Sequence, residues 1–229
     1  MDEFAACDLP SRAPVGARKR LGPVWIGAFV AWMTATGGAA FAMTQYASKA
    51  GDSAAAPTSW PTSSHLARTP GRGTVVMIAH TKCACTRASL RELERLMARA
   101  GDRAEAFVVF VGPHEKPAIG LLDLRETARG IPGVTVVEDE NEARIFGAST
   151  SGQVVLYDMN GALLFRGGIT PSRGHEGNTA GGETVRRFVT GEDAGAGNTF
   201  TTASEVFGCA LFNRNEDSGV TTSGVGEEP

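Results

Sequence analysis

Hydrophobic and polar positions divide the chain into a charge-free segment near the N-terminus and a longer region in which apolar runs alternate with polar ones. In the longer region, residues 74–80 (TVVMIAH) and 105–112 (EAFVVFVG) are continuous runs of apolar, largely β-branched side chains. Such runs are typical of strands that are buried on both faces of a sheet. A third run, at 134–139 (VTVVED), predicts another strand of the same sheet.

Helical periodicity lies between these strands. Residues 86–101 place Leu90, Leu93, Met97 and Ala100 on one stripe and end at a glycine, which predicts an amphipathic helix. Shorter helices are predicted at 118–129, 143–147 and 183–189.

A β-hairpin is predicted at 153–168 (QVVLYDMNGALLFRGG), with residues 158–161 as its turn. The resulting order of elements is β-α-β-α-β-α-β-β-α. Helical crossovers give parallel strands, and the hairpin adds antiparallel ones. The sequence therefore predicts an α/β fold with a mixed sheet and helices on both faces.

The charge-free segment covers residues 21–48 and is longer than the roughly 20 apolar residues that span a bilayer. Four basic residues between positions 12 and 20 precede it, and only Lys49 follows closely. The positive-inside rule then predicts a signal anchor. It would consist of a cytoplasmic tail (1–20), a single transmembrane helix (21–46) and an extracytoplasmic, periplasmic remainder.

Two other interpretations of this segment remain open. Residues 40–42 (AFA) resemble a signal-peptidase site, so the segment can also be a cleaved signal peptide. It can also be a helix of a soluble protein. Either form of export delivers the domain to an oxidising compartment. With an uncleaved anchor, Cys7 stays on the cytoplasmic side, apart from the other cysteines.

Two low-complexity stretches border the folded region. Residues 47–72 are rich in Ala, Ser, Thr and Pro, which predicts a flexible linker in which Trp60 and His65 are incidental. Residues 213–229 are polar and acidic, which predicts a disordered tail. The predicted folded domain is therefore 73–212.

Composition excludes some function classes. The 229 residues include 22 Lys and Arg against 25 Asp and Glu, and the folded part carries no basic block. Nucleic-acid binding, which depends on clustered basic residues, is therefore not expected. Four cysteines are too few for a disulfide-built scaffold.

The candidate chemistry lies in Cys83-Ala84-Cys85, directly after the first strand and before the first long helix. A helix N-terminus and the adjacent Lys82 both favour a thiolate, and a second thiol can resolve a mixed disulfide. A disulfide across one residue would be strained and easily reduced. The pair predicts thiol–disulfide exchange without a cofactor; soft-metal binding and a structural role remain open.

Four further residues are candidate accessory groups. His80 ends the first strand and can raise the thiolate population. Arg173 and His175 lie in the glycine-rich segment 167–182, and Cys209 lies in the apolar stretch SEVFGCALF. Cys209 can be a buried apolar residue, a partner of Cys83 or Cys85, or a metal ligand. In the metal alternative, Cys83 and Cys85 bind Cu(I) together with His175 or Cys209.

The segments VVMIAHTKCAC and FGASTSGQVVLYDMNGALLFRGG resemble the thioredoxin fold. They resemble in particular the membrane-tethered, extracytoplasmic thioredoxin-like proteins of the TlpA/ResA type and the RedB-like group, over residues 73–190. The resemblance implies an oxidoreductase that acts on protein thiols and disulfides of the cell envelope. Copper-delivery assembly factors of the same fold look similar in using a cysteine pair and a distant His. The chain departs from the family at Thr86, where the second cysteine of C-x-x-C would fall, and at Gly152, where the family has a cis-proline.

Overall fold

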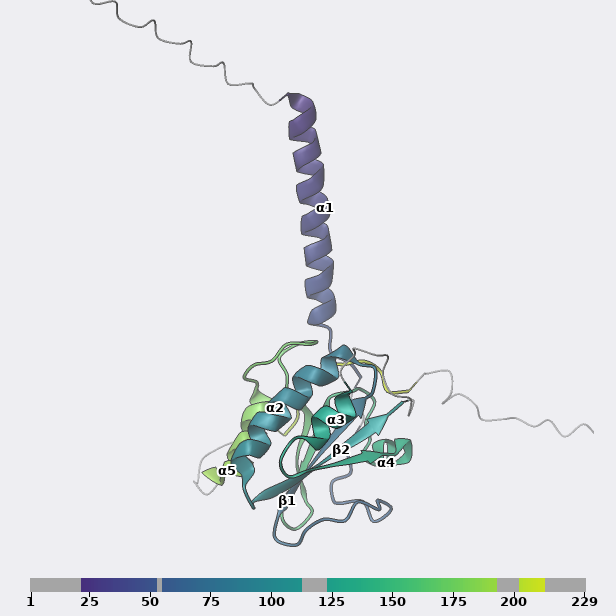
Figure 1. Cartoon of the computed structure of the whole chain (residues 1–229), viewed down its shortest axis with the longest axis vertical. Helices are drawn as coiled ribbons and strands as arrows, with labels where there is room; N and C mark the ends of the chain where they lie inside the picture. The colour runs from purple at the N-terminus through teal and green to yellow at the C-terminus, as the bar shows by residue number, and fades with distance from the viewer. Residues whose placement is uncertain (1–21, 53–54, 113–122, 193–201, 213–229) are drawn as a thin grey trace, which may run out of the picture. The chain divides into compact units, whose positions relative to one another are not determined.

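The computed structural model describes residues 22–52, 55–112, 123–192 and 202–212 (Figure 1). Contacts divide the chain into two units, one ending at Met43 and one beginning at Thr44. The second unit contains the sheet and all three described cysteines.

Helix α1 (Pro23–Ala47) is a single apolar helix without a charged residue. None of its residues is buried, and the mean hydropathy of its most apolar 18-residue window is 1.4. At 1.5 Å per residue it is about 37 Å long, which exceeds the roughly 30 Å of a hydrocarbon core. Trp25 and Tyr46 lie near its two ends, where interfacial aromatic residues are favoured. The helix is consistent with the predicted signal anchor, while the basic residues before it fall outside the described part.

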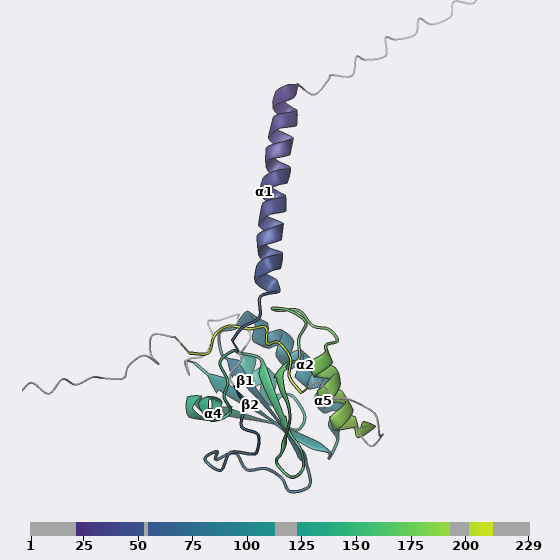
Figure 2. The ribbon, with the colours of Figure 1, turned by 180° about the vertical axis from the view of Figure 1, so that it is seen from behind.

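Five strands form one sheet in the order β3-β2-β1-β4-β5 (Figures 1 and 2). Strands β1, β2 and β3 are parallel neighbours, in the pairs β1–β2 and β2–β3, whereas β4 pairs antiparallel with both β1 and β5. The mixed sheet predicted from the sequence is confirmed. The strands are β1 (Gly73–His80), β2 (Ala104–Val111), β3 (Val134–Glu138), β4 (Gln153–Tyr157) and β5 (Leu163–Gly168).

Helices cover both faces of this sheet, as predicted. Three of them, α2 (Ala84–Ala100), α3 (Leu124–Arg129) and α5 (Ala180–Thr190), pack on one face, and α4 (Glu140–Ile145) packs on the other. The arrangement is thioredoxin-like. Part of the helix predicted at 118–129 lies outside the described residues. Helix α4 begins before the predicted 143 because the Asp139 side chain accepts hydrogen bonds from two amides of its first turn.

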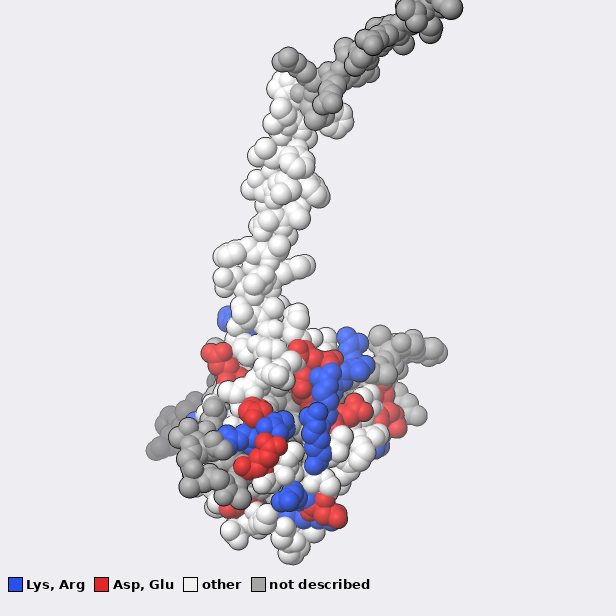
Figure 3. Space-filling view, turned by 90° about the vertical axis from the view of Figure 1, so that its left-hand side faces the viewer, with Lys and Arg blue, Asp and Glu red and all other residues white. Residues whose placement is uncertain are grey.

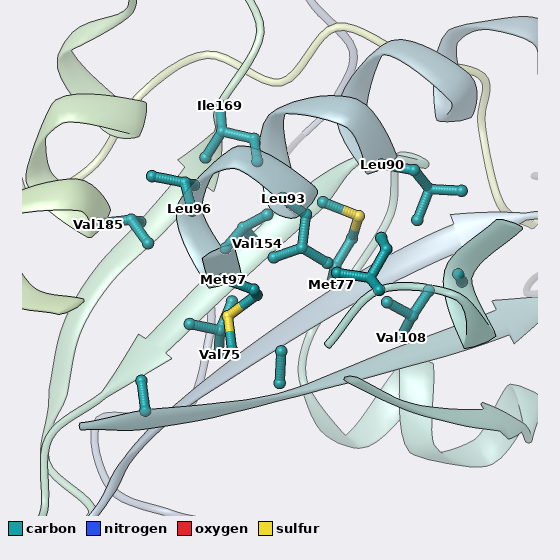
Figure 4. Close-up of a cluster of buried hydrophobic side chains, with 14 of the residues drawn as sticks. Val75, Met77, Leu90, Leu93, Leu96, Met97, Val108, Val154, Ile169 and Val185 are labelled. Atoms are coloured by element: carbon teal, nitrogen blue, oxygen red, sulfur yellow. The ribbon is translucent and has the colours of Figure 1, made fainter. Parts of the chain in front are cut away.

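The predicted stripe of α2 forms the centre of the larger core. Leu90, Leu93 and Met97 are buried against Val75 and Met77 of β1 (Figure 4). The opposite side of α2 is solvated, and Figure 3 shows acidic and basic residues intermingled on one face of the molecule. This packing fixes the first turn of α2 at the carboxyl end of β1.

The structure differs from the predicted flexible linker over residues 56–66, which pack on the domain. The Trp60 ring lies edge-on to Phe146 and Tyr157, with centroids 5.2 and 5.3 Å apart respectively. The Tyr157 hydroxyl donates to the carbonyl oxygen of Pro57 at 3.0 Å, and Leu66 is buried. The short helix α4 leaves much of its face of the sheet uncovered, and these apolar linker residues cover it.

His65 is also held in place, although the composition predicts an incidental residue. Its backbone N–H and its ring Nδ1 each lie 2.9 Å from Oε1 of Glu142, a fully buried carboxylate of α4. The Ser64 hydroxyl donates to the second oxygen of the same carboxylate at 2.7 Å. A buried carboxylate requires such partners, and here the linker supplies them.

Candidate redox site

Cys83 is the N-cap residue of α2, directly after the turn that follows β1. Its N–H donates to the carbonyl oxygen of His80 at 3.2 Å, which closes this turn. The residue is 2% exposed, so its sulfur lies inside the protein rather than on the surface. Cys85, in the first turn of the helix, is partly exposed.

A third cysteine reaches the site from the C-terminal part of the chain. The sulfur of Cys209 lies 2.8 Å from the sulfur of Cys83. All three described cysteines are free thiols in this structure. The sequence left the role of Cys209 open among three alternatives, and the structure places it beside Cys83.

Residues 202–212, which we name the strap, carry Cys209 (yellow in Figure 2). The strap runs along β5 and then pairs antiparallel with residues 149–151, through an isolated bridge between Thr150 and Ala210. The Gly168 N–H donates to the carbonyl oxygen of Glu205 at 3.1 Å, and the Ser151 N–H donates to that of Cys209 at 2.8 Å. The Leu211 N–H of the strap donates to the carbonyl oxygen of Ser149 at 3.0 Å. The strap satisfies backbone groups that an edge strand and a loop would otherwise leave open.

The protonation state of Cys83 is set by opposing effects. Burial raises the pKa of its thiol, but the Cys209 thiol and the N–H groups of Cys209, Cys85 and Thr86 stabilise the thiolate. These hydrogen bonds outweigh burial and bring the pKa of Cys83 below its ordinary value of 9.0. Cys83 is therefore the thiol of the cluster that ionises first.

The other two cysteines are held as thiols. Burial raises the pKa of Cys209 to about 12, and the neighbouring charge and hydrogen bond of Cys83 add to this effect. Burial and Cys83 likewise raise the pKa of Cys85. Arg173 opposes both shifts, because its positive charge favours the two thiolates. Cys83 is thus the cysteine of the cluster that most readily becomes a thiolate, and its two partners keep their protons to higher pH.

Arg173 connects the strap to the start of the domain. Its guanidinium donates to the carbonyl oxygen of Gly208 and, at 3.2 Å, to that of Lys49, and it lies 5.0 Å from the ring centroid of Tyr46. The first of these contacts holds the residue that precedes Cys209.

His80 and Lys82 lie beside Cys83 without bonding its sulfur in the described part of the chain. The His80 ring Nδ1 accepts from the Lys82 amide at 3.1 Å, and the His80 amide donates to the Ser151 hydroxyl at 2.9 Å. Burial lowers the pKa of His80, and the charge of Lys82 lowers it further. His80 is therefore a neutral residue that fixes the turn before Cys83, while the Lys82 side chain is exposed.

His175 does not join the cysteines. Its ring Nδ1 lies 2.9 Å from the carbonyl oxygen of Arg173, and its side chain is exposed. Among the described residues, no group of three or more His, Cys, Asp or Glu side chains is arranged to hold a metal ion. The Cu(I) ligand set of Cys83, Cys85 and His175 is thus not assembled in this structure.

Both departures from the family pattern have structural consequences. Thr86 is buried, and its hydroxyl lies 2.9 Å from the Ser151 hydroxyl, which ties α2 to the loop before β4. Gly152 has a φ of +90° and donates its N–H to the carbonyl oxygen of Ile78 at 2.7 Å. Proline has neither this N–H nor this φ, so the loop next to Cys83 is built differently from a cis-proline loop.

Comparisons with known proteins find matches among solved structures only. No family model matches the chain, and no curated protein matches it. An uncharacterized conserved protein from Geobacillus kaustophilus is 17% identical, with a TM-score of 0.47, over 72% of this chain and 92% of that one. A hypothetical protein from Sinorhizobium meliloti is 19% identical, with a TM-score of 0.47, over 71% and 93%. A putative thiol:disulfide interchange protein DsbE from Chlorobium tepidum is 15% identical, with a TM-score of 0.39, over 62% and 96%.

Proposed function

We propose that the chain is a membrane-anchored, extracytoplasmic thiol–disulfide oxidoreductase in which Cys83 is the attacking thiolate. The observation that carries the proposal is the Cys83 sulfur at the start of α2, 2.8 Å from a second sulfur. The lowered pKa of Cys83 supports it, because the thiolate is the reacting form of a cysteine.

In the reducing direction, the Cys83 thiolate attacks one sulfur of a substrate disulfide, a Cys83–substrate disulfide forms, and the other substrate sulfur leaves as a thiolate. A second thiol of the cluster then loses its proton and attacks the Cys83 sulfur. This step releases the substrate as a dithiol and leaves a disulfide in the protein. Two electrons pass to the substrate, and the reverse sequence oxidises a substrate dithiol.

The proposed partners are proteins of the cell envelope with exposed thiols or disulfides. Helix α1 supports this location, because it is long and apolar enough to span a membrane. In the proposed topology, residues 1–20 are cytoplasmic and the domain after α1 is periplasmic. A reporter that is active only outside the cytoplasm, fused after residue 212, should be active; activity of a cytoplasmic reporter at that position would contradict the topology.

The exchange reaction is tested by equilibrating the full chain, in detergent, across a series of glutathione redox poises and counting alkylated thiols by mass. We expect two thiols to disappear together as the poise becomes oxidising, and Cys83→Ser to abolish the transition. Cys7→Ser is the matched control and should leave it unchanged. Thiols that remain alkylatable at every poise would overturn the proposed function.

A further inference from the structure

We propose that the redox-active disulfide of this protein joins Cys83 to Cys209, so that the strap carries the resolving thiol. The inference rests on the proposed function of Cys83 and names its intramolecular partner. It replaces the Cys83–Cys85 couple that the sequence spacing predicts with a pair 126 residues apart in the chain.

The geometry favours Cys209 because its sulfur already faces that of Cys83. The two sulfurs are 2.8 Å apart, against about 2.05 Å in a disulfide, so only a small approach is needed. The carbonyl oxygen of Cys209 accepts a hydrogen bond from the Ser151 N–H in the loop before β4, and the Arg173 guanidinium donates to the adjacent carbonyl oxygen of Gly208. The strap therefore presents Cys209 to Cys83 in a fixed position.

Cys85 is disfavoured by the helix that contains it. Cys83 is the N-cap of α2 and Cys85 is the second residue of that helix. Side chains two positions apart on a helix do not face each other, and although the Cys85 thiol is near enough to Cys83 to have its pKa raised by it, the 2.8 Å sulfur contact of Cys83 is with Cys209. A Cys83–Cys85 bond would therefore require the first turn of α2 to unwind. That turn is anchored through Thr86, which is buried and contacts the Ser151 hydroxyl.

The charge on Cys83 determines when Cys209 can ionise. While Cys83 is a thiolate, its charge and hydrogen bond help to raise the pKa of Cys209 to about 12, after the larger effect of burial. Once Cys83 forms a bond to a substrate sulfur, that negative charge is gone. Arg173 then favours ionisation of Cys209 without opposition from Cys83. Cys209 gives its proton to the first-released substrate thiolate, attacks the Cys83 sulfur and expels the second substrate thiolate. That thiolate takes a proton from solvent, so the products are a substrate dithiol and the Cys83–Cys209 disulfide.

The strap also controls access to Cys83. Cys83 is 2% exposed, and Cys209 lies against its sulfur, so a large substrate reaches Cys83 only after the strap has moved. The Cys83–Cys209 disulfide would tie the strap down covalently, whereas in the thiol state its described links to residues 149–151 are backbone hydrogen bonds, which can open without breaking a covalent bond. The same bond would thus be the two-electron acceptor of the protein and the latch of the site.

The disulfide can be mapped in the full chain after oxidation with glutathione, alkylation and digestion with trypsin without reduction. Trypsin releases Cys83 and Cys85 together in peptide 83–87 (CACTR) and Cys209 in peptide 188–214. We expect these two peptides to be linked in the unsubstituted chain and in Cys85→Ser. We expect the link to be lost in Cys83→Ser and in Cys209→Ser. Cys7→Ser is the control that should retain it.

The outcomes separate this inference from the proposed function. A peptide 83–87 that is two hydrogens lighter, with Cys209 alkylated, assigns the bond to Cys83 and Cys85; it overturns the inference and leaves the proposed function intact. A link that persists in Cys83→Ser as fully as in Cys85→Ser also overturns the inference. Absence of any intramolecular disulfide at every poise overturns both.

Discussion

The backbone N–H of Ser151 donates a hydrogen bond to the carbonyl oxygen of Cys209, with 2.8 Å between nitrogen and oxygen. This bond lets the loop before β4 set the position of a cysteine from the far end of the domain. Gly208 allows the close approach, because a Cβ at this position would collide with the carbonyl oxygen of Ser151. The strap therefore depends on a glycine next to the cysteine that it carries.

Gly208→Ala should displace the strap and lower the equilibrium constant for linking peptides 83–87 and 188–214, measured across the glutathione poises, about tenfold, a change of about 1.4 kcal/mol. Gly130→Ala is the matched control, since a Cβ there meets its neighbours at ordinary distances. A Gly208→Ala chain that forms the link as readily as the control would show that the strap does not position Cys209.

Cys209→Ala should raise the pKa of Cys83, because it removes the thiol that stabilises the Cys83 thiolate. Cys209→Ser keeps a hydroxyl donor and should shift this pKa less. The measurement is the pH dependence of Cys83 alkylation, with Cys85 and Cys7 replaced by serine in every chain. In the parent, half-maximal alkylation should fall below pH 9.0, and its midpoint should rise in the alanine variant. Equal midpoints in all three chains would contradict the assigned hydrogen bond.

Trp60→Ala should destabilise the domain by about 2 kcal/mol, because it removes two edge-on aromatic contacts, with Phe146 and Tyr157, from the core on the α4 face of the sheet. Denaturant unfolding of the full chain in detergent measures the loss. Met159→Ala is the control, since Met159 is half-exposed in the hairpin turn. If residues around Trp60 form a flexible linker, both variants will unfold at the same denaturant concentration.

Tyr157 should make the folded domain sensitive to alkaline pH. Burial raises the pKa of its hydroxyl to about 12, from an ordinary value of 10.0. The folded state favours the neutral hydroxyl, so this contribution is fully present below pH 10.0 and is lost as the pH rises through about 12. With Tyr46→Phe as the parent, ultraviolet titration follows Tyr157 alone, as the chain has two tyrosines. A midpoint near 10 in the folded chain would contradict burial of this hydroxyl.

The sequence predicted the elements whose burial follows a simple period. The apolar runs of β1 and β2 and the stripe of Leu90, Leu93 and Met97 indicated a sheet with a helix packed on it, and the structure has both. The linker was misjudged because Ala, Ser, Thr and Pro dominate its composition. Trp60 contacts Phe146, which follows α4, and His65 contacts Glu142 of α4. The sequence pattern within the linker does not show that this face of the sheet is left uncovered by α4.

Of the two cysteines in contact at the candidate site, the sequence predicts the position of Cys83 but not that of Cys209. A cysteine at a helix start has a local signature, so Cys83 was identified from its position after the first strand. The position of Cys209 follows from backbone pairing between the strap and residues 149–151, which are distant in sequence. The apolar stretch around Cys209 indicated that it packs on the domain but not against which residue. The link to Arg173 through the Gly208 carbonyl had no signal in the sequence at all.

The most direct test of the account is a rapid-quench reaction of the reduced full chain with oxidised glutathione, in which the first modified cysteine is identified by mass. We predict that glutathione appears first on Cys83, whose thiol ionises most readily of the three. This adduct should then decay as the link between Cys83 and Cys209 forms, and it should accumulate in Cys209→Ser. A first adduct on Cys85 or Cys209, or an unchanged reaction rate in Cys83→Ser, would contradict the central claim.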